Sequence, residues 1–260
     1  MPLLSVENLR TSYTSRGHTL HAVDGVSLEI GENETVGLVG ESGCGKSTLG
    51  KTIVRLLRPS EGVIRLNDQD ISQLGERSLR AVRRTVQMVF QDPFGSLNPR
   101  QRVGTILDTP LWVHGVKDAK ARRRRILEII GKISLPEAAL QRYPHEFSGG
   151  QRQRIGIARA LVLRPKLVVC DEPVSALDLS IQAQILNLLV DLKKDFGLAY
   201  LFISHDLSVV RYFADRVLVM YLLRIVEGAD HAAQPAPSLY ACLAGIDSIG
   251  DTGQEAGGRA

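Results

Sequence analysis

The sequence predicts an α/β fold in which helices cover a parallel sheet. Four runs are apolar without alternation, as in strands buried on both faces; they occupy residues 35–39, 86–90, 167–170 and 200–204. Helical patterns separate these runs, and strands that alternate with helices imply a parallel, doubly wound sheet. The length of 260 residues permits one large domain, or one domain with an inserted subdomain.

The N-terminal part is expected to contain short strands, a glycine-rich loop and one helix. Residues 3–39 should form the strands, with turns at Arg16-Gly17 and Asp24-Gly25. The helix after the loop should run from Lys46 to Leu57, because the chain reaches Pro59 two residues later and the residue before a proline disfavours helical geometry.

A helical, charged block is expected at about residues 92–165, as a subdomain inserted between two strands. It holds four consecutive arginines at 122–125, which we interpret as a solvated helix face. Apolar side chains then recur at spacings of three, and the block should close with a helix from Gly150 to Leu163; the recurring side chains are Leu127, Ile130 and Ile133.

A further helix is predicted by the stripe of apolar residues from Ile181 to Phe196. We expect the main domain to occupy residues 1–228. The remaining residues, 229–260, should form a short extension that is partly flexible, with a small helix near Leu239 to Ile246.

Composition restricts the function only weakly. The net charge of +4 is compatible with phosphate ligands, an anionic membrane surface or nucleic acid. The three cysteines contain no C-x-x-C pair, so zinc has little support and a reducing compartment is expected. No signal peptide is apparent, and the apolar stretch Val217 to Leu223 is far below the ~18 residues of a membrane-spanning helix.

A nine-residue loop after the first apolar run matches the pattern G-x-x-x-x-G-K-[ST]. Glycines let the backbone wrap closely around a polyphosphate, and the following helix points its N-terminus at the anion. Lys46 should neutralise phosphate charge, Ser47 should bind Mg²⁺ through its hydroxyl, and Thr48 should support the loop. The loop is Gly40-Glu41-Ser42-Gly43-Cys44-Gly45-Lys46-Ser47-Thr48.

Two carboxylates, Asp171 and Glu172, end the apolar run at 167–170. An acid at the carboxyl end of a strand can face the phosphate loop across the ligand crevice. Asp171 suits the Mg²⁺ shell, and Glu172 suits polarisation of an attacking water. A surface acidic turn is the alternative interpretation, which the neighbouring phosphate loop makes less attractive.

A second glycine-containing loop precedes the helix expected at Gly150. Its serine and exposed N–H groups would bind a γ-phosphate, although a serine before a helix is also a common cap. If both loops serve one nucleotide, two subunits must face each other. The loop is Phe147-Ser148-Gly149-Gly150-Gln151.

Together these segments resemble the ATP-binding-cassette (ABC) family: residues 40–48 are similar to its Walker A motif, 167–172 to Walker B and 147–151 to its signature motif. The resemblance implies a P-loop NTPase core with an antiparallel β subdomain and an inserted helical subdomain. It also implies head-to-tail dimers that bind ATP and Mg²⁺. Further matching positions are Gln91 (Mg²⁺ or water), Asp178 (the D-loop), His205 (the γ-phosphate) and Tyr13 (adenine stacking).

Residues 89–100 and 142–146 look like the dipeptide, oligopeptide and nickel importer ATPases of bacteria. That resemblance implies two membrane permease subunits, a substrate-binding protein and a second ATPase, which is usually non-identical; a homodimer remains the alternative. It implies a peripheral location at the cytoplasmic face of the inner membrane. Leu223 departs from the pattern, which usually has glycine there. Competing interpretations are a nucleic-acid-handling cassette, which is not expected, and a scaffold, against which Glu172 and His205 argue.

Overall fold

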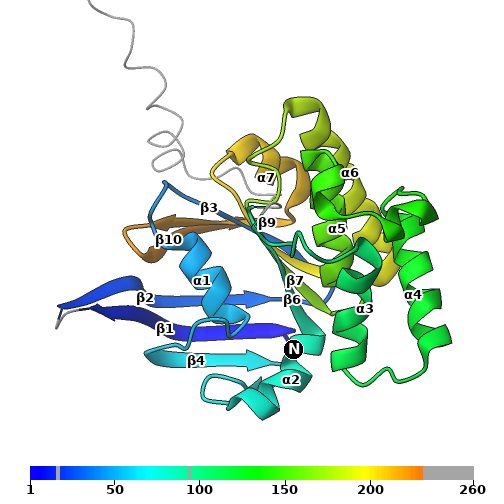
Figure 1. Ribbon diagram of the computed structural model, residues 1–260. Coiled ribbons are helices and arrows are strands. Elements are labelled where there is room, and N and C mark those ends of the chain that lie inside the picture. Colours follow the sequence, from blue (N-terminus) through cyan, green and yellow to red (C-terminus); the bar gives the residue numbers. More distant parts are fainter. Residues whose placement is uncertain (16–17, 93–94, 231–260) are drawn as a thin grey trace, which may run out of the picture.

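The computed structural model describes residues 1–15, 18–92 and 95–230, and it confirms the predicted parallel sheet (Figure 1). The sheet has six strands in the order β10-β9-β3-β8-β7-β6; all neighbouring pairs are parallel except β9 and β10, which are antiparallel. The strands are β3 (Thr35–Val39), β6 (Val86–Val89), β7 (Leu167–Asp171), β8 (Ala199–Ile203), β9 (Arg216–Tyr221) and β10 (Arg224–Asp230).

The N-terminal strands form a separate antiparallel sheet in the order β2-β1-β4-β5, as the family resemblance implies. These strands are long, and the expectation of short strands with a turn at Asp24-Gly25 is wrong. Gly25 has φ 66 and lies within a strand whose pairing shifts register there, so it forms an irregularity and not a chain reversal. Arg16-Gly17 lies outside the described residues. The strands are β1 (Leu4–Ser15), β2 (His18–Ile30), β4 (Glu61–Leu66) and β5 (Gln69–Asp70).

Helix α1 (Lys46–Ile53) follows the glycine-rich loop and ends four residues before the predicted Leu57. The reason is Arg55, which has φ 59 and is buried. Its guanidinium donates to the carbonyl oxygens of Ile71 and Leu74 at 2.9 and 3.3 Å. The buried Arg55 guanidinium can make these bonds only when the Arg55 backbone leaves the helical conformation. A tertiary contact therefore ends the helix before Pro59 is reached.

The predicted helical block is present, between β6 and β7. Its helix α4 holds the four arginines and packs through Ile126, Ile129 and Ile130, whereas Leu127 is only partly buried. The spacing pattern therefore identified the helix and two buried positions, Ile130 and Ile133, and was wrong only for Leu127. The helical elements of this block are α3 (Val103–Val113), α4 (Ala119–Lys132), α5 (Gly149–Leu161) and the 3-10 turns η1 (Glu137–Gln141) and η2 (Pro144–Glu146), whereas α2 (Glu76–Thr85) precedes β6.

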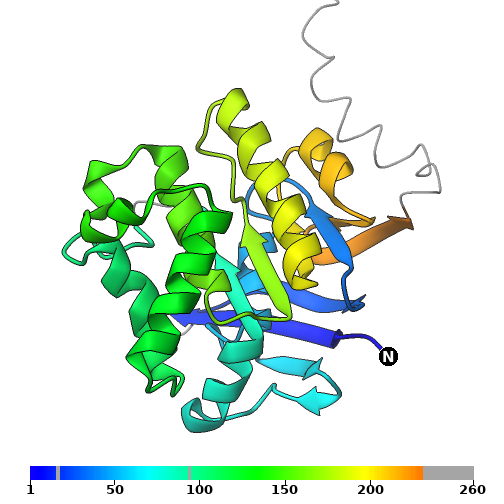
Figure 2. The same ribbon diagram turned by 90° about the vertical axis from the view of Figure 1, so that its right-hand side faces the viewer.

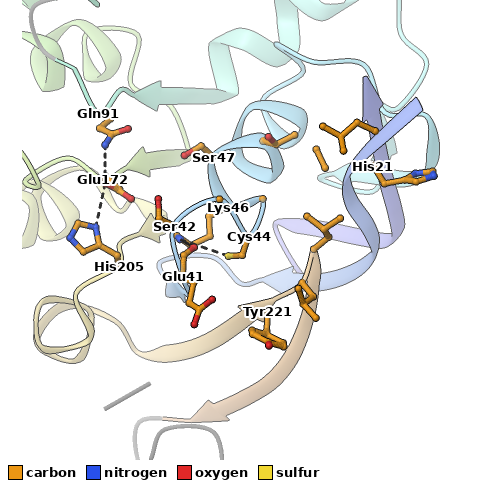
Figure 3. A pocket seen from close by; sticks show the side chains of 17 residues that line it. His21, Glu41, Ser42, Cys44, Lys46, Ser47, Gln91, Glu172, His205 and Tyr221 are labelled. Atoms are coloured by element: carbon orange, nitrogen blue, oxygen red, sulfur yellow. Dashed lines mark hydrogen bonds and ion pairs between the residues drawn. The ribbon is translucent and has the colours of Figure 1, made fainter. Parts of the chain in front are cut away.

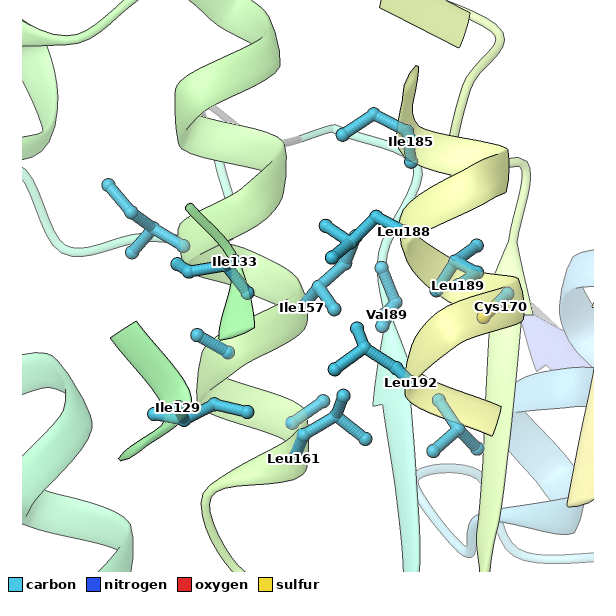
Figure 4. Close-up of a cluster of buried hydrophobic side chains, with 14 of the residues drawn as sticks. Val89, Ile129, Ile133, Ile157, Leu161, Cys170, Ile185, Leu188, Leu189 and Leu192 are labelled. Atoms are coloured by element: carbon cyan, nitrogen blue, oxygen red, sulfur yellow. The ribbon is translucent and has the colours of Figure 1, made fainter. Parts of the chain in front are cut away.

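The parallel sheet separates two hydrophobic cores. On one face, α5 and α6 (Leu179–Phe196) bury Ile157 and Leu189 against side chains of β6 and β7, as Figure 4 shows. On the other face, α1 packs between the two sheets (Figure 1). Figure 2 shows α6, in yellow, in front of the strands of the parallel sheet. Because β3, β6, β7 and β8 are parallel, their carboxyl ends lie at the same edge of the sheet.

Among the described residues, no helix is both long enough and apolar enough to cross a membrane. A last short helix, α7 (Leu207–Phe213), precedes β9. The small helix predicted near Leu239 to Ile246 and most of the predicted C-terminal extension lie outside the described residues.

Candidate functional site

The glycine-rich loop joins β3 to α1 and packs tightly against two other segments. A Cβ atom on Gly45, which has φ 104, would lie 2.3 Å from the carbonyl oxygen of Ala22. A Cβ on Gly40 would lie 2.1 Å from the carbonyl oxygen of Met220. Only glycine fits at these two positions, which fixes the shape of the loop. No side chain caps the N-terminus of α1, so its first N–H groups are not bound by a side chain.

Lys46 is buried, and its ammonium group lies inside this loop. The Nζ atom donates to the carbonyl oxygens of Gly40 and Glu41, at 2.7 Å in both cases. It also lies 3.8 Å from the Sγ atom of Cys44. A cation in the curve of a loop, beside the positive end of a helix, makes this an anion-binding position.

Ser47 and Asp171 link the loop to the end of β7. The Ser47 hydroxyl donates to Oδ1 of Asp171 at 2.7 Å. Burial raises the pKa of the Asp171 carboxyl, although the hydrogen bond from Ser47 acts in the opposite direction. A hydroxyl and a carboxylate are oxygen donors of the kind that Mg²⁺ accepts.

Glu172 follows directly and is joined to two of the other predicted residues (Figure 3). Gln91 Nε2 donates to Oε2 of Glu172 at 2.9 Å, and His205 Nδ1 lies 3.4 Å from the same oxygen. Glu172 has φ 45, an unusual conformation for a residue with a side chain. This backbone turn separates its side chain from that of Asp171, which points to Ser47.

These residues surround a pocket of about 900 Å³. Of the predicted site residues, Glu41 to Thr48, Gln91, Glu172 and His205 line it, and Asp171 is joined to it through Ser47. Sequence reasoning did not assign six further lining residues to the site. No motif marks these residues, which come from β2, from the end of β9 and from the turn after β9; they are Leu20, His21, Ala22, Tyr221, Leu222 and Leu223.

Tyr13 does not line this pocket. It lies on β1 directly opposite Leu20 of β2, and its residue surface is 43% exposed. Its expected role in stacking on adenine therefore remains a prediction.

The second glycine-containing loop also lies outside this pocket, at the start of α5. Ser148 and Gln151 form reciprocal capping bonds, of 3.4 Å to the Ser148 hydroxyl and 3.1 Å to the Gln151 side-chain oxygen. A Cβ atom on Gly150 would lie 2.6 Å from Ile181, and Gly149 faces Leu177. The loop is thereby packed against the start of α6, where Asp178 is the cap.

Comparison with known proteins gives close matches over most of the chain. Residues 23–175 match the family described as ABC transporter. The chain is 56% identical over 207 residues to the oligopeptide transport ATP-binding protein AppF of Bacillus subtilis. It is 51% identical over 251 residues to a Brucella ovis protein named for peptide import ATP binding, and 53% identical over 236 residues to the glutathione import ATP-binding protein GsiA of Shigella boydii.

These alignments cover 79%, 95% and 87% of this chain. They cover 63%, 79% and 37% of the three relatives, so the chain spans less than two thirds of the Bacillus protein. Two solved structures are also similar. A dimeric post-hydrolysis state of the ATP-binding cassette MJ0796, bound to ADP and Pi, has a TM-score of 0.80 at 29% identity and covers 89% of this chain and 100% of its own. CbiO1 from Clostridium perfringens, part of the cbiONQ transporter complex, has a TM-score of 0.78 at 27% identity and covers 95% and 94%.

Proposed function

The chain belongs to the ABC transporter family, and we propose that it binds and hydrolyses ATP as the ATPase subunit of an importer. The observation that carries this proposal is a single pocket in which an anion-binding loop faces a carboxylate joined to an amide and an imidazole. Such a site combines phosphate binding with a group that can orient water.

In the proposed reaction, Lys46 and the loop N–H groups hold the phosphates. Glu172 orients a water molecule for attack on the γ-phosphorus and accepts its proton as the bond to the bridging oxygen breaks, which releases ADP and phosphate. Gln91 and His205 position Glu172 and the γ-phosphate. Ser47, Asp171 and Gln91 would hold Mg²⁺, which when bound neutralises charge on the phosphate oxygens. Tyr13 would stack on adenine.

We also propose that the site is completed by a second ATPase subunit. Ser148 to Gln151 form a capped helix start that does not line the chain's own pocket, and Asp178 lies beside it. A γ-phosphate held in a neighbouring subunit is a ligand of the right charge for this helix start. A related but different ATPase is the proposed partner, with a second copy of this chain as the alternative.

The cargo is proposed from the relatives, whose names specify oligopeptides, peptides and glutathione. We propose that the chain couples hydrolysis to uptake of peptides or a similar small solute, at the cytoplasmic face of the bacterial cell membrane. Two permease subunits and a substrate-binding protein would complete the transporter. Two of the four arginines, Arg122 and Arg123, are ion-paired with Asp108 and Glu137, and the Arg122 side chain is only 14% exposed, which argues against a nucleic-acid site.

The test is reconstitution of the chain with its permease subunits in lipid vesicles. Phosphate release from MgATP should depend on the chain, and a loaded peptide-binding protein should increase it while peptide accumulates in the vesicles. Hydrolysis that is unaffected by any peptide would contradict the cargo but leave the ATPase assignment intact. The absence of hydrolysis by the complete transporter would contradict both.

A further inference from the structure

The last turn of helix α5 carries a partly buried arginine, Arg159. Burial lowers the pKa of the Arg159 guanidinium, so its surroundings disfavour the charged form. The side chain nevertheless stays charged, because an arginine is not deprotonated in a protein. A cation held away from water destabilises a fold unless its contacts compensate, so the contacts of Arg159 show what this side chain contributes.

The guanidinium contacts two residues that lie on either side of Gln91 in the sequence. Its Nη1 atom donates to the carbonyl oxygen of Ser96. Its Cζ atom lies 5.8 Å from the centre of the Phe90 ring, which is within the range of a cation–π interaction. Arg159 therefore holds the chain immediately before Gln91 and again after it.

Gln91 needs such support because it lies beyond the end of β6, where strand pairing no longer fixes the backbone. Its side-chain amide donates to Oε2 of Glu172 at 2.9 Å, the same oxygen that His205 approaches. A loop residue keeps this bond only while its backbone stays in place. A displacement of about 1 Å at a reacting group can lower a rate by about 100-fold.

The structure that carries Arg159 is well packed on both sides of the sheet. In α5, Leu161 is buried in the same core as Val89 of β6, as Figure 4 shows. Phe90 packs against the core on the opposite face of the sheet. Arg159 thus ties the position of Gln91 to both cores.

We infer that Arg159 is a positioning residue for hydrolysis, which fixes the chain on both sides of Gln91 and so holds the Gln91 amide against Glu172. Arg159 does not line the pocket, so it acts through Gln91 and not on the nucleotide. The inference rests on the proposed ATPase function, in which Gln91 positions Glu172, and it adds to that site a residue from outside the pocket.

The test is a double-mutant cycle between Arg159 and Gln91 in the reconstituted transporter. Arg159→Met removes the guanidinium and keeps a long side chain. We expect kcat with MgATP to fall about 10- to 100-fold, the effect of a displaced positioning group. The Kd of the full chain for MgATP should change little, because Lys46 and its loop are untouched. In the Gln91→Ala background, the same substitution should lower kcat no further.

Arg154→Met is the matched control. Arg154 lies on the same helix and also donates to a backbone carbonyl oxygen, that of Ile133 at the end of α4, at 3.0 Å. Its loss should leave kcat unchanged in both backgrounds.

A second variant, Phe90→Leu, removes the ring from the other side of the contact and keeps an apolar side chain. It should lower kcat by a smaller factor than Arg159→Met does, and again have no effect in the Gln91→Ala background. This variant decides the question if Arg159→Met does not fold. Single-turnover phosphate release measures all the rates, so that slow variants are included.

The remaining outcomes separate the inference from the function on which it rests. Equal losses of kcat from Arg159→Met in the native and Gln91→Ala backgrounds would overturn the inference, because Arg159 would then act independently of Gln91. A native rate in Arg159→Met, while Lys46→Ala is inactive, would also overturn it and leave the ATPase assignment intact. If the native transporter does not hydrolyse MgATP, the proposed function fails and the inference fails with it.

Discussion

At the scale of single residues, Lys46 occupies the most informative position in the pocket. Its ammonium group is buried and bonded to two carbonyl oxygens of the loop, so it organises the loop as well as its ligand. Removal of the charge should therefore affect phosphate binding more than it affects the fold, whose cores lie elsewhere.

We expect Lys46→Ala to weaken ATP binding roughly 10- to 100-fold, the effect of losing one or two charge-assisted hydrogen bonds. Hydrolysis should fall further, because negative charge moves during phosphoryl transfer. Lys166→Ala, which removes an exposed lysine paired with Glu32, is the control and should change neither value. Hydrolysis near the native rate at saturating MgATP in the Lys46 variant would exclude the proposed phosphate role.

Asp171 lowers the stability of the folded chain at neutral pH, although its charge serves the proposed metal site. Its carboxyl is buried and its pKa is raised above the ordinary value, so the folded chain binds this proton more tightly than the unfolded chain. The stability from this group is greatest below the unfolded-state pKa and is lost as pH rises through the folded-state pKa. At neutral pH the ionised carboxylate therefore opposes folding.

We expect Asp171→Asn to stabilise the chain at neutral pH by roughly 0.5 to 2 kcal/mol, because the amide can still accept from Ser47 and carries no charge. Metal-dependent hydrolysis should fall at the same time. The gain should shrink as pH is lowered, since protonation neutralises the native carboxyl as well. Chemical denaturation at several pH values measures this, and a variant less stable than the native chain at neutral pH would contradict it.

At the scale of secondary-structure elements, the start of α5 should serve a neighbouring subunit and not its own pocket. Loss of the Ser148 cap in Ser148→Ala should cost about 1 kcal/mol of stability. The variant should bind ATP normally as a monomer but hydrolyse it much more slowly in the assembled ATPase pair. A loss of ATP affinity in the monomer would instead assign this loop to its own pocket.

The control for this change is Asp118→Ala. It removes a comparable cap from α4, where the Asp118 carboxylate accepts from the Lys120 N–H at 2.9 Å. The melting temperature should fall in both variants, whereas hydrolysis should fall only in Ser148→Ala. This pair of variants separates loss of helix stability from loss of a phosphate contact.

At the scale of the whole molecule, the separation between pocket and α5 predicts an ATP-dependent dimer. Glu172→Gln should lower the hydrolysis rate by about 10² to 10⁴, the range expected for loss of a general base. ATP binding should survive, because Lys46, Ser47 and Asp171 remain. Removal of a negative charge near the γ-phosphate should also favour association of the two ATPase subunits. A stable dimer should therefore accumulate in the presence of ATP.

Size-exclusion chromatography with light scattering tests this dimer, on the chain alone and mixed with a partner ATPase. Glu128→Gln removes an exposed acid paired with Arg164 and should leave both hydrolysis and assembly unchanged. A Glu172 variant that hydrolyses at the native rate, or one that stays monomeric with its partner and MgATP, would argue against a shared site.

The sequence by itself determined the elements whose signals are local. Strands buried on both faces have continuous apolar runs, and the parallel sheet follows from β3, β6, β7 and β8. The loop from Gly40 to Thr48 was also predictable, because glycine and lysine spacing directly reflects backbone geometry around an anion. The carboxylates after β7 were predictable from their position at the end of a buried strand.

Only the tertiary structure decided which distant side chains meet. Glu172 meets Gln91 and His205 because β6, β7 and β8 are adjacent in the sheet, and adjacency depends on long-range pairing. The early end of α1 depends on carbonyl acceptors that Arg55 reaches only in the folded chain. The pocket likewise brings together β2 and the turn after β9, which are about 200 residues apart in the sequence. These contacts have no local sequence signal, because burial and strand pairing are properties of the complete fold.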